Sequence, residues 1–511
     1  MSPHTAASRK RLPEQARIVI VGAGMAGLGT AFRLLAAGID DFVVLERADR
    51  VGGTWRDNDY PGCAVDIASA YYSYSFAPKH DWSHSFARQP ELLAYLEDLA
   101  TTPAVAQRLH LDCGMTAARW DDATGRWQVE TSAGTISAQL LVPAVGILNR
   151  VSTPDLPGLD TFEGKVFHTT EWDHDYDLRG RHVAVIGTGS TASQVIPAIA
   201  PEVGHLTVFQ RSAGWVLTRV DWKVSRAEKL LMKHVPAVMR ARRWRQHWMR
   251  EGVLFPVLTN PGRNLTVVES VLRLFLRRQV PDPQIRAKLT PKDRFGCKRP
   301  ILSSDYLRTY MRDNVDLVTD PITEVRPNGV CTADGREHPI DALVLATGFK
   351  PYEWVDAARV VGRSGQTLDH DWKEHGARSY LGGAVHGFPN LFYVVGPNTA
   401  VYSSILFVIE QVIDHFVATV QEMDARKIRV LEARADAQDE FGTEMDDRLD
   451  GTVWTSGCAS WLLHDSRHNP TLWPGDTTEF AGRLKYLDLL AYDITPADGT
   501  VSDLPRVPQF L

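Results

Sequence analysis

The amino-acid sequence predicts an α/β fold built on two dinucleotide-binding units. Two glycine-rich segments, residues 22–27 and 187–192, each follow a β-branched run and precede apolar residues at helical spacing. A strand, a glycine turn and a helix in this order are typical of a Rossmann-type domain. The segments begin 165 residues apart (187 − 22), so each has room for its own domain. A basic stretch of helical character, residues 222–295, predicts an inserted, mainly helical subdomain.

The first glycine-rich segment has each part that a dinucleotide site requires. Gly22 permits a tight turn, Gly24 lets the backbone approach a pyrophosphate, and Gly27 lets helix and strand pack closely. The N-terminus of the following helix offers free N–H groups to the phosphates. Glu46 lies 19 residues after Gly27 (46 − 27), at the end of the strand predicted over residues 42–45. An acid there can bind unphosphorylated ribose hydroxyls, so we expect FAD or NAD(H) at this site.

A loop follows the second strand. Glycines and a proline favour an irregular loop over residues 52–66, which contains Gly53 and Thr54 and presents Trp55 and Asp66. Taken alone, an Asp before Ile-Ala-Ser is more often a loop or helix cap than a site residue.

Further elements are predicted to complete this first unit. Apolar periodicity indicates an amphipathic helix over residues 91–110. Alternating residues predict a small antiparallel excursion over residues 115–142, and residues 140–146 are expected to end the unit as a buried strand. A long helix is predicted from about Ser404 to Met423.

The second glycine-rich segment differs from the first in the residue at its ribose position. Its turn contains Gly187, Gly189, Ser190 and Thr191, and Arg211 occupies the same offset that Glu46 has in the first unit. A guanidinium can pair bidentately with a 2′-phosphate, which an acid would repel. We therefore expect FAD in the first unit and NADPH in the second.

Composition excludes several other classes of function. The net charge of −6 gives no reason to expect a nucleic-acid partner. No apolar run reaches the roughly 18 residues of a membrane helix, and no signal-peptide core follows the basic N-terminus. The five cysteines are scattered and form no CxxC pair. We therefore expect no metal site and a reducing compartment, the cytoplasm.

The basic segment around residues 222–251 leaves two alternatives open. It contains nine Lys and Arg against two Glu, with Trp244 and Trp248 among them. A helical subdomain with a solvated basic face is the simpler interpretation. Peripheral contact with a membrane surface is the alternative, because basic amphipathic helices with tryptophans bind such surfaces.

Residues 162–173 link the two units and contain a recognisable pattern. The pattern is Phe162-x-Gly164-x-x-x-His168-x-x-x-Trp172-Asp173. It resembles the fingerprint of the Baeyer–Villiger monooxygenases, FAD- and NADPH-dependent enzymes that convert ketones into esters or lactones. Relatives that oxygenate amines and sulfides usually carry a Tyr where this chain has Trp172. An ordinary linker with a capping His and a packed Trp would be the alternative.

The resemblance extends from about Arg17 to Phe480 and implies roles for particular residues. It implies that the loop with Gly53, Thr54 and Trp55 lies against the flavin and that Asp66 points into the active site. It also implies that Lys298 binds the 2′-phosphate beside Arg211, that Arg299 stands over the flavin and is catalytic, and that Trp461 contacts NADP. The chain departs from the family pattern at Val145 and at Leu462, where a polar residue and a Tyr are usual.

The implied reaction is insertion of one oxygen atom of O2 beside a ketone carbonyl through a C4a-peroxyflavin. Arg299 would supply a fixed positive charge at the reacting oxygens, and Asp66 would position it. One alternative is a flavin-containing monooxygenase that oxygenates amines or sulfides. A remote alternative is a non-catalytic nucleotide-binding flavoprotein. The identity of the ketone and the oligomeric state do not follow from the sequence.

These signals divide the chain into five predicted segments. They are the first part of the FAD domain (1–150), the first part of the NADP domain (151–221), the helical insert (222–295), the second part of the NADP domain (296–349) and the second part of the FAD domain (350–511).

Overall fold

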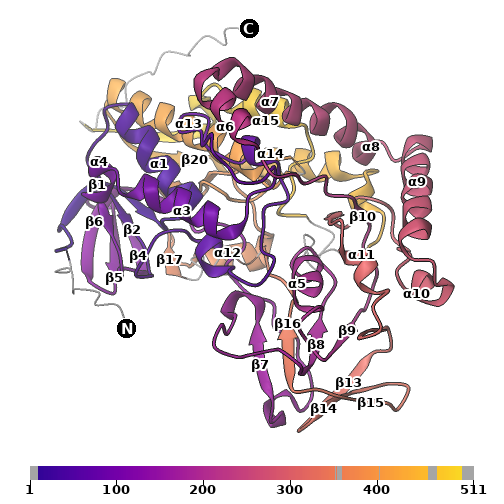
Figure 1. Cartoon of the computed structure of the whole chain (residues 1–511). Coiled ribbons are helices and arrows are strands. Elements are labelled where there is room, and N and C mark those ends of the chain that lie inside the picture. The colour runs from indigo at the N-terminus through magenta and orange to yellow at the C-terminus, as the bar shows by residue number, and fades with distance from the viewer. Residues whose placement is uncertain (1–9, 352, 354–358, 402, 459–468, 498–511) are drawn as a thin grey trace.

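Two sheets, one for each glycine-rich segment, form the frame of the molecule (Figure 1): the larger is mixed, with parallel strands around β1 (Gln15–Val21), and the smaller is parallel. The computed structural model describes residues 10–351, 353, 359–401, 403–458 and 469–497. The larger sheet lies at the left of Figure 1 and the smaller one at the lower centre. This mixed α/β architecture is the fold class that the sequence predicts.

The larger sheet contains the first glycine turn. Its strands are β1 (Gln15–Val21), β2 (Phe42–Leu45), β3 (Leu109–His110), β4 (Met115–Asp121), β5 (Arg126–Thr131), β6 (Gly134–Pro143), β17 (Val360–Val361), β18 (Ala384–Val385) and β19 (Phe388–Phe392). The spatial order is β17-β4-β5-β6-β1-β2-β3, with β19 paired to β6 and to β18. β1 lies between β2 and β6, with Ile18 opposite Phe42 on one side and Leu140 on the other. Because these strands are parallel, their carboxyl ends meet at one edge, where the glycine turn lies.

Three local predictions in this unit require correction. The predicted antiparallel excursion is present as β4, β5 and the start of β6, but it is not separate from the buried strand, because β6 pairs with β5 at its start and continues beside β1 to Pro143. The helix predicted over residues 91–110 is α3 (Gln89–Ala100), followed by the short α4 (Pro103–Ala106), because Pro103 cannot continue α3. The predicted loop contains one helical turn, α2 (Thr54–Asp57).

Two long helices cover the first glycine turn. α1 (Met25–Ala36) begins directly after the turn, and α13 (Ile405–Ala425) packs against it, close to the predicted bounds. Gly38 adopts φ +76° after α1, and its amide donates to the carbonyl of Leu35, as a left-handed helix C-terminus requires.

The second sheet has five strands, all parallel. They are β7 (Lys165–His168), β8 (His182–Ile186), β9 (His205–Phe209), β12 (Val315–Val318) and β16 (Ala342–Leu345). Their spatial order is β12-β9-β8-β16-β7. The segment that we predicted to be a linker is therefore partly an edge strand of this sheet. The second glycine turn leads from β8 into α5 (Ala192–Ile199).

The remaining elements extend these two frames. Helices fill the predicted insert: α6 (Arg226–His234), α7 (Pro236–Met249), the π-helical turn η4 (Arg250–Leu254), α8 (Phe255–Thr259), α9 (Arg263–Gln279) and α10 (Pro283–Lys288). Smaller strands are β10 (Val216–Leu217), β11 (Ile301–Leu302), β13 (Ile322–Arg326), β14 (Gly329–Thr332), β15 (Glu337–Pro339), β20 (Ile428–Ala433) and β21 (Tyr492–Pro496). The other helices are α11 (Tyr306–Thr309), α12 (Leu368–His375), α14 (Ala435–Leu449) and α15 (Thr477–Leu484).

The packing of α1 on β1 predicts that Gly27 tolerates no side chain. A Cβ at Gly27 would overlap the carbonyl oxygen of Gly22, which is backbone and cannot swing aside. We expect Gly27→Ala to lower the free energy of unfolding by about 3 kcal/mol and to weaken retention of FAD. Gly482→Ala on α15 is the matched control, because a Cβ there meets no atom within 4 Å. Equal melting temperatures for the two variants would contradict this packing.

Candidate active site

A cavity of about 410 Å³ opens at the carboxyl edge of the larger sheet. Six of the residues predicted to bind FAD line it: Gly22, Gly24, Glu46, Gly53, Thr54 and Trp55. The seventh, Gly27, lies behind the turn and packs against Gly22. The volume lies within the range of cofactor sites.

The backbone around this cavity leaves room for phosphates. Gly24 and Gly53 face each other so closely that a Cβ on Gly53 would come within 3.1 Å of the Gly24 Cα atom. Gly24 also precedes the first turn of α1, whose free N–H groups and dipole favour a bound anion. A pyrophosphate therefore fits this end of the cavity.

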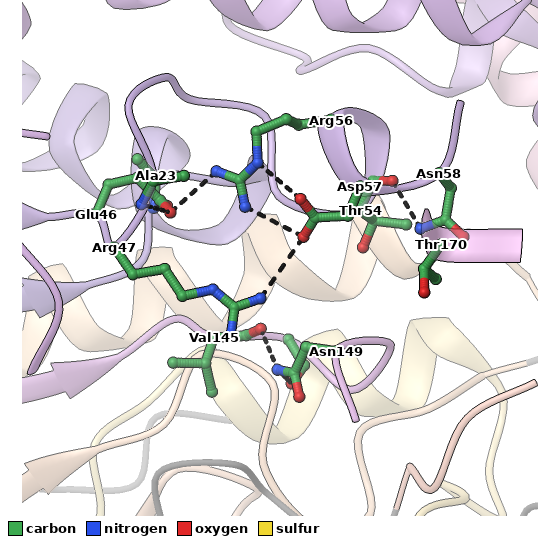
Figure 2. Close-up of polar contacts among 12 residues, drawn as sticks. Ala23, Glu46, Arg47, Thr54, Arg56, Asp57, Asn58, Val145, Asn149 and Thr170 are labelled. Atoms are coloured by element: carbon green, nitrogen blue, oxygen red, sulfur yellow. Dashed lines mark hydrogen bonds and ion pairs between the residues drawn. The ribbon is translucent and has the colours of Figure 1, made fainter. Parts of the chain in front are cut away.

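Glu46 is held by a network of contacts that the sequence does not reveal (Figure 2). One carboxylate oxygen accepts from the Ala23 amide in the glycine turn at 2.8 Å, and the other accepts from Arg56 at 2.9 Å. Arg56 also pairs with Asp57 at 2.7 Å. Burial lowers the pKa of Arg56, but Asp57 and Glu46 outweigh it and raise the pKa above its ordinary value. Glu46 thus fixes the shape of the turn as well as facing the cavity.

The two residues predicted to be catalytic lie together, 233 positions apart in the chain. Arg299 donates from its terminal nitrogen to a carboxylate oxygen of Asp66 at 2.8 Å. Burial raises the pKa of Asp66, but the charges of Arg299 and Arg250 outweigh it and hold the pKa below its ordinary value. Asp66 is therefore an anion at neutral pH, as a residue that positions a guanidinium must be.

Arg250 is a site residue that sequence reasoning missed. It begins η4 in the insert and donates to the backbone carbonyl of Asp66 at 3.3 Å. Burial lowers its pKa, although Asp66 acts in the other direction. Its Nε is buried without a hydrogen-bond partner among the residues that the structure describes. Nothing in the sequence distinguishes Arg250 from the eight other basic residues of that segment; only the fold turns it inward.

The residues predicted to bind NADP gather at the second glycine turn. Gly187 adopts φ +119°, and the space where a Cβ would lie on Gly189 holds no atom within 4 Å. Ser190 and Thr191 follow directly before α5. Lys298 donates to the hydroxyl of Ser212 at 3.0 Å, next to Arg211. Lys298 also pairs with Asp293 at 2.6 Å. Arg211 is exposed and makes no ion pair in the described part of the chain, which leaves its guanidinium available to a phosphate.

The fingerprint residues lie at the edge of the second sheet, where the chain crosses between units. His168 ends β7, is buried, and packs edge-on against Phe349 with ring centroids 6.1 Å apart. Burial lowers the pKa of His168, although Glu171 and the backbone of Gly348 act in the other direction. Phe349 also forms an isolated β-bridge with Val151.

The other fingerprint residues hold this edge together. The Trp172 ring meets Phe167 edge-on at 4.9 Å, and Asp173 pairs with Lys165 at 2.6 Å. A Cβ on Gly164 would overlap the ring of Phe162, so the glycine lets that ring fold back on the turn. The predicted NADP contact Trp461 lies outside the described residues.

Comparison with known proteins decides the family. Residues 15–246 match the model of the flavin-binding monooxygenase-like family. A Baeyer–Villiger monooxygenase of Streptomyces coelicolor is 43% identical over 491 residues, covering 96% of this chain and 94% of that protein. One of Pseudomonas aeruginosa is 37% identical over 490 residues, covering 94% and 91%. This chain belongs to the Baeyer–Villiger monooxygenase family.

Solved structures agree with this membership. An oxidized steroid monooxygenase bound to NADP superimposes with a TM-score of 0.84 at 32% identity, covering 94% of this chain and 99% of that one. A cyclohexanone monooxygenase from a Rhodococcus species, bound to NADP+, has a TM-score of 0.85 at 29% identity, covering 95% and 100%. These findings favour the Baeyer–Villiger interpretation over oxygenation of amines or sulfides and over a non-catalytic flavoprotein.

One feature of this Baeyer–Villiger monooxygenase contradicts an expectation from its cysteines. Their scatter suggested a compartment where disulfides are rare, yet the structure joins Cys297 to Cys458 with Cα atoms 6.2 Å apart. Cys63, Cys113 and Cys331 are free and buried. The bond ties Cys297, which directly precedes Lys298, to Cys458 in the C-terminal part of the chain. Spacing in the sequence could not reveal it because 161 residues separate the partners.

The disulfide predicts a measurable dependence of stability on reduction. We expect Cys297→Ser/Cys458→Ser to lose about 2–4 kcal/mol of stability relative to the oxidised enzyme. Dithiothreitol should lower the melting temperature of the unchanged enzyme to that of the variant and leave the variant unaffected. Thiol titration in denaturant, without reductant, should find three thiols. Five thiols, or equal melting with and without reductant, would show that the bond does not form.

Proposed function

We propose that this enzyme inserts one atom of O2 beside the carbonyl carbon of a ketone, using FAD and NADPH, and releases an ester or lactone. The observation that carries the proposal is the ion pair of Asp66 and Arg299, which joins the first unit to the segment after the insert in a member of this family. A fixed cation at the reacting oxygens is what this oxygen transfer requires.

The two cofactors would occupy the two glycine turns. FAD fits the cavity at the first turn, with its pyrophosphate over Gly24 and its ribose at Glu46. NADPH fits the second turn, with its 2′-phosphate between Arg211 and Lys298. When bound, they supply hydride transfer and activation of O2, which no side chain provides.

The protein's own contribution would be charge and orientation. Arg299 stays protonated at any working pH, so it can stabilise negative charge that develops on the reacting oxygens. Asp66 holds the guanidinium from one side, and Arg250 adds a second positive charge near the pair. Because Asp66 has a lowered pKa, this arrangement persists from neutral pH down to moderately acidic pH.

His168 and Trp172 would couple the two units and take no part in bond making. His168 ends the edge strand β7, and Trp172 lies after the turn that follows it. The His168 ring packs on the ring of Phe349. A change in either unit would pass through this contact to the other. Such positions often govern reduction and product release far from the chemistry.

We also propose where the enzyme works and how its chain divides. Its reductant NADPH and its three free thiols suit the cytoplasm, whereas the Cys297–Cys458 disulfide is of a kind that is rare there. The FAD domain would comprise residues 1–150 and 350–511, and the NADP domain residues 151–221 and 296–349, with the insert at 222–295.

Selectivity for NADPH over NADH tests the second site. We expect Arg211→Ala to raise the KM for NADPH by about tenfold or more, since a charged hydrogen bond contributes about 1.5–3 kcal/mol, and to leave the KM for NADH unchanged. Arg179→Ala is a matched control, because Arg179 is exposed and pairs only locally with Asp177. Equal use of both cofactors by the unchanged enzyme would refute the assignment.

Arg299→Ala tests the chemistry apart from cofactor binding. The variant should hold FAD and bind NADPH, because Arg211 and Lys298 remain. Ester formed per NADPH oxidised should fall by about a hundredfold or more, with the oxygen released as hydrogen peroxide. Asp66→Ala should lower the ester yield in the same way but less severely. Arg299→Lys should restore little of the yield, because the lysine ammonium lacks the planar, paired donors of a guanidinium.

The readout is ester yield per NADPH, with ¹⁸O2 to identify the source of the inserted oxygen. Labelled ester at near the original yield from Arg299→Ala would show that this residue has no catalytic role and that the Lys-Arg pair only binds phosphate.

A further inference from the structure

The helical insert carries nearly all the exposed apolar side chains of the described residues. Of sixteen large hydrophobic residues that are exposed, thirteen fall between residues 220 and 275. They are Val220, Trp222, Leu230, Leu231, Val235, Trp244, Trp248, Met249, Val253, Val267, Val271, Leu274 and Phe275. Scattered single hydrophobics are normal on a surface, but such a concentration in one segment marks an interaction site.

Helix α9 has two apolar faces, of which the fold uses only one. Leu265, Leu272 and Leu276 are buried against the protein. The opposite side presents Val267, Val271, Leu274 and Phe275, which are 43–61% exposed. Their spacing of four, three and one places them on one stripe of the helix. This second stripe has no partner among the residues that the structure describes.

Helix α7 also has an exposed apolar group. Trp244 is 66% exposed and Trp248 is 45% exposed, one turn apart, with ring centroids 6.4 Å apart. Met239 on the inner side of α7 is buried. In Figure 1, α6 to α9 follow one another along the upper and right-hand border of the molecule, outside both sheets.

The charge of this surface selects its partner. Residues 222–280 contain 13 Lys and Arg and 3 Glu, a net charge of +10 (13 − 3) in a chain of net charge −6. All three glutamates pair with or accept hydrogen bonds from other residues of the chain. Glu228 pairs with Arg242, Glu251 accepts from the amide of Thr477 at 3.0 Å, and Glu269 pairs with Arg294 at 2.9 Å. The outer face is therefore apolar and cationic.

We propose that the outer face of α6, α7 and α9 docks on an anionic lipid surface. Basic side chains interleaved with tryptophan and aliphatic residues fit the boundary between headgroups and acyl chains. Lys and Arg can lay their stems on the apolar surface and place their charges among lipid phosphates. A second copy of the chain would bring the same net charge of +10 against itself, which disfavours a symmetric dimer through this face.

The contact would be peripheral. Among the described residues, no helix combines the length and the apolar character needed to cross a bilayer. Docking through the insert would bring the lipid surface near a segment that contacts the site, because η4 follows α7 and carries Arg250 to Asp66.

Vesicle flotation of the full FAD-loaded chain tests this docking. We expect binding to vesicles of phosphatidylcholine and phosphatidylglycerol, and little binding to phosphatidylcholine alone. Raising the salt from about 0.01 M to about 1 M, which shortens the Debye length from about 30 Å to about 3 Å, should weaken the binding strongly. Trp244→Ser/Trp248→Ser and Val267→Ser/Leu274→Ser should each reduce bound protein about tenfold.

The matched control is Tyr486→Ser/Leu490→Ser, which removes two exposed hydrophobics outside the insert. It should bind as the unchanged enzyme does, and all variants should keep their FAD and melting temperature. Absence of binding to anionic vesicles, or equal loss in the control variant, would overturn the proposal. A dimer in sedimentation that the insert variants abolish, without vesicle binding, would assign the face to a second copy and overturn it as well.

Discussion

The ion pair of Asp66 and Arg299 is the constraint on which the site depends. Its partners come from a loop of the first unit and from the segment that follows the insert. A partly buried charge left without its counter-ion is costly, so the two segments are held in one arrangement. The arrangement exists only when both sheets are formed and docked.

One glutamine makes several of the polar contacts between the two units. Gln194 on α5 accepts from the Tyr60 hydroxyl and the Ala64 amide, both at 3.2 Å, and donates to the Ala64 carbonyl at 3.0 Å. Gly62 adopts φ +83°, and a Cβ there would lie 2.6 Å from the Gln194 carbonyl oxygen. The loop that leads to Asp66 is thus seated directly on the helix of the second glycine turn.

The inner side of the insert contacts the site, and its outer side is exposed. Inward, Arg250 approaches Asp66 and Glu251 accepts from the amide at the start of α15. Outward, the same helices present the cationic apolar face.

The sequence by itself determined the two glycine turns, their strands and helices, and the choice of acid or arginine at the ribose positions, because these depend on residues within about 25 positions of one another. It also placed Asp66 and Arg299 in one site by family resemblance. The sequence analysis was wrong about elements that depend on strand pairing with distant residues. β7 is a strand because β16 lies beside it, and β6 is continuous because it pairs with both β1 and β5. Only the tertiary structure decided which of many arginines turns inward, that Cys297 meets Cys458, and that one face of α9 is left uncovered, since each depends on segments that are remote in the chain and adjacent in space.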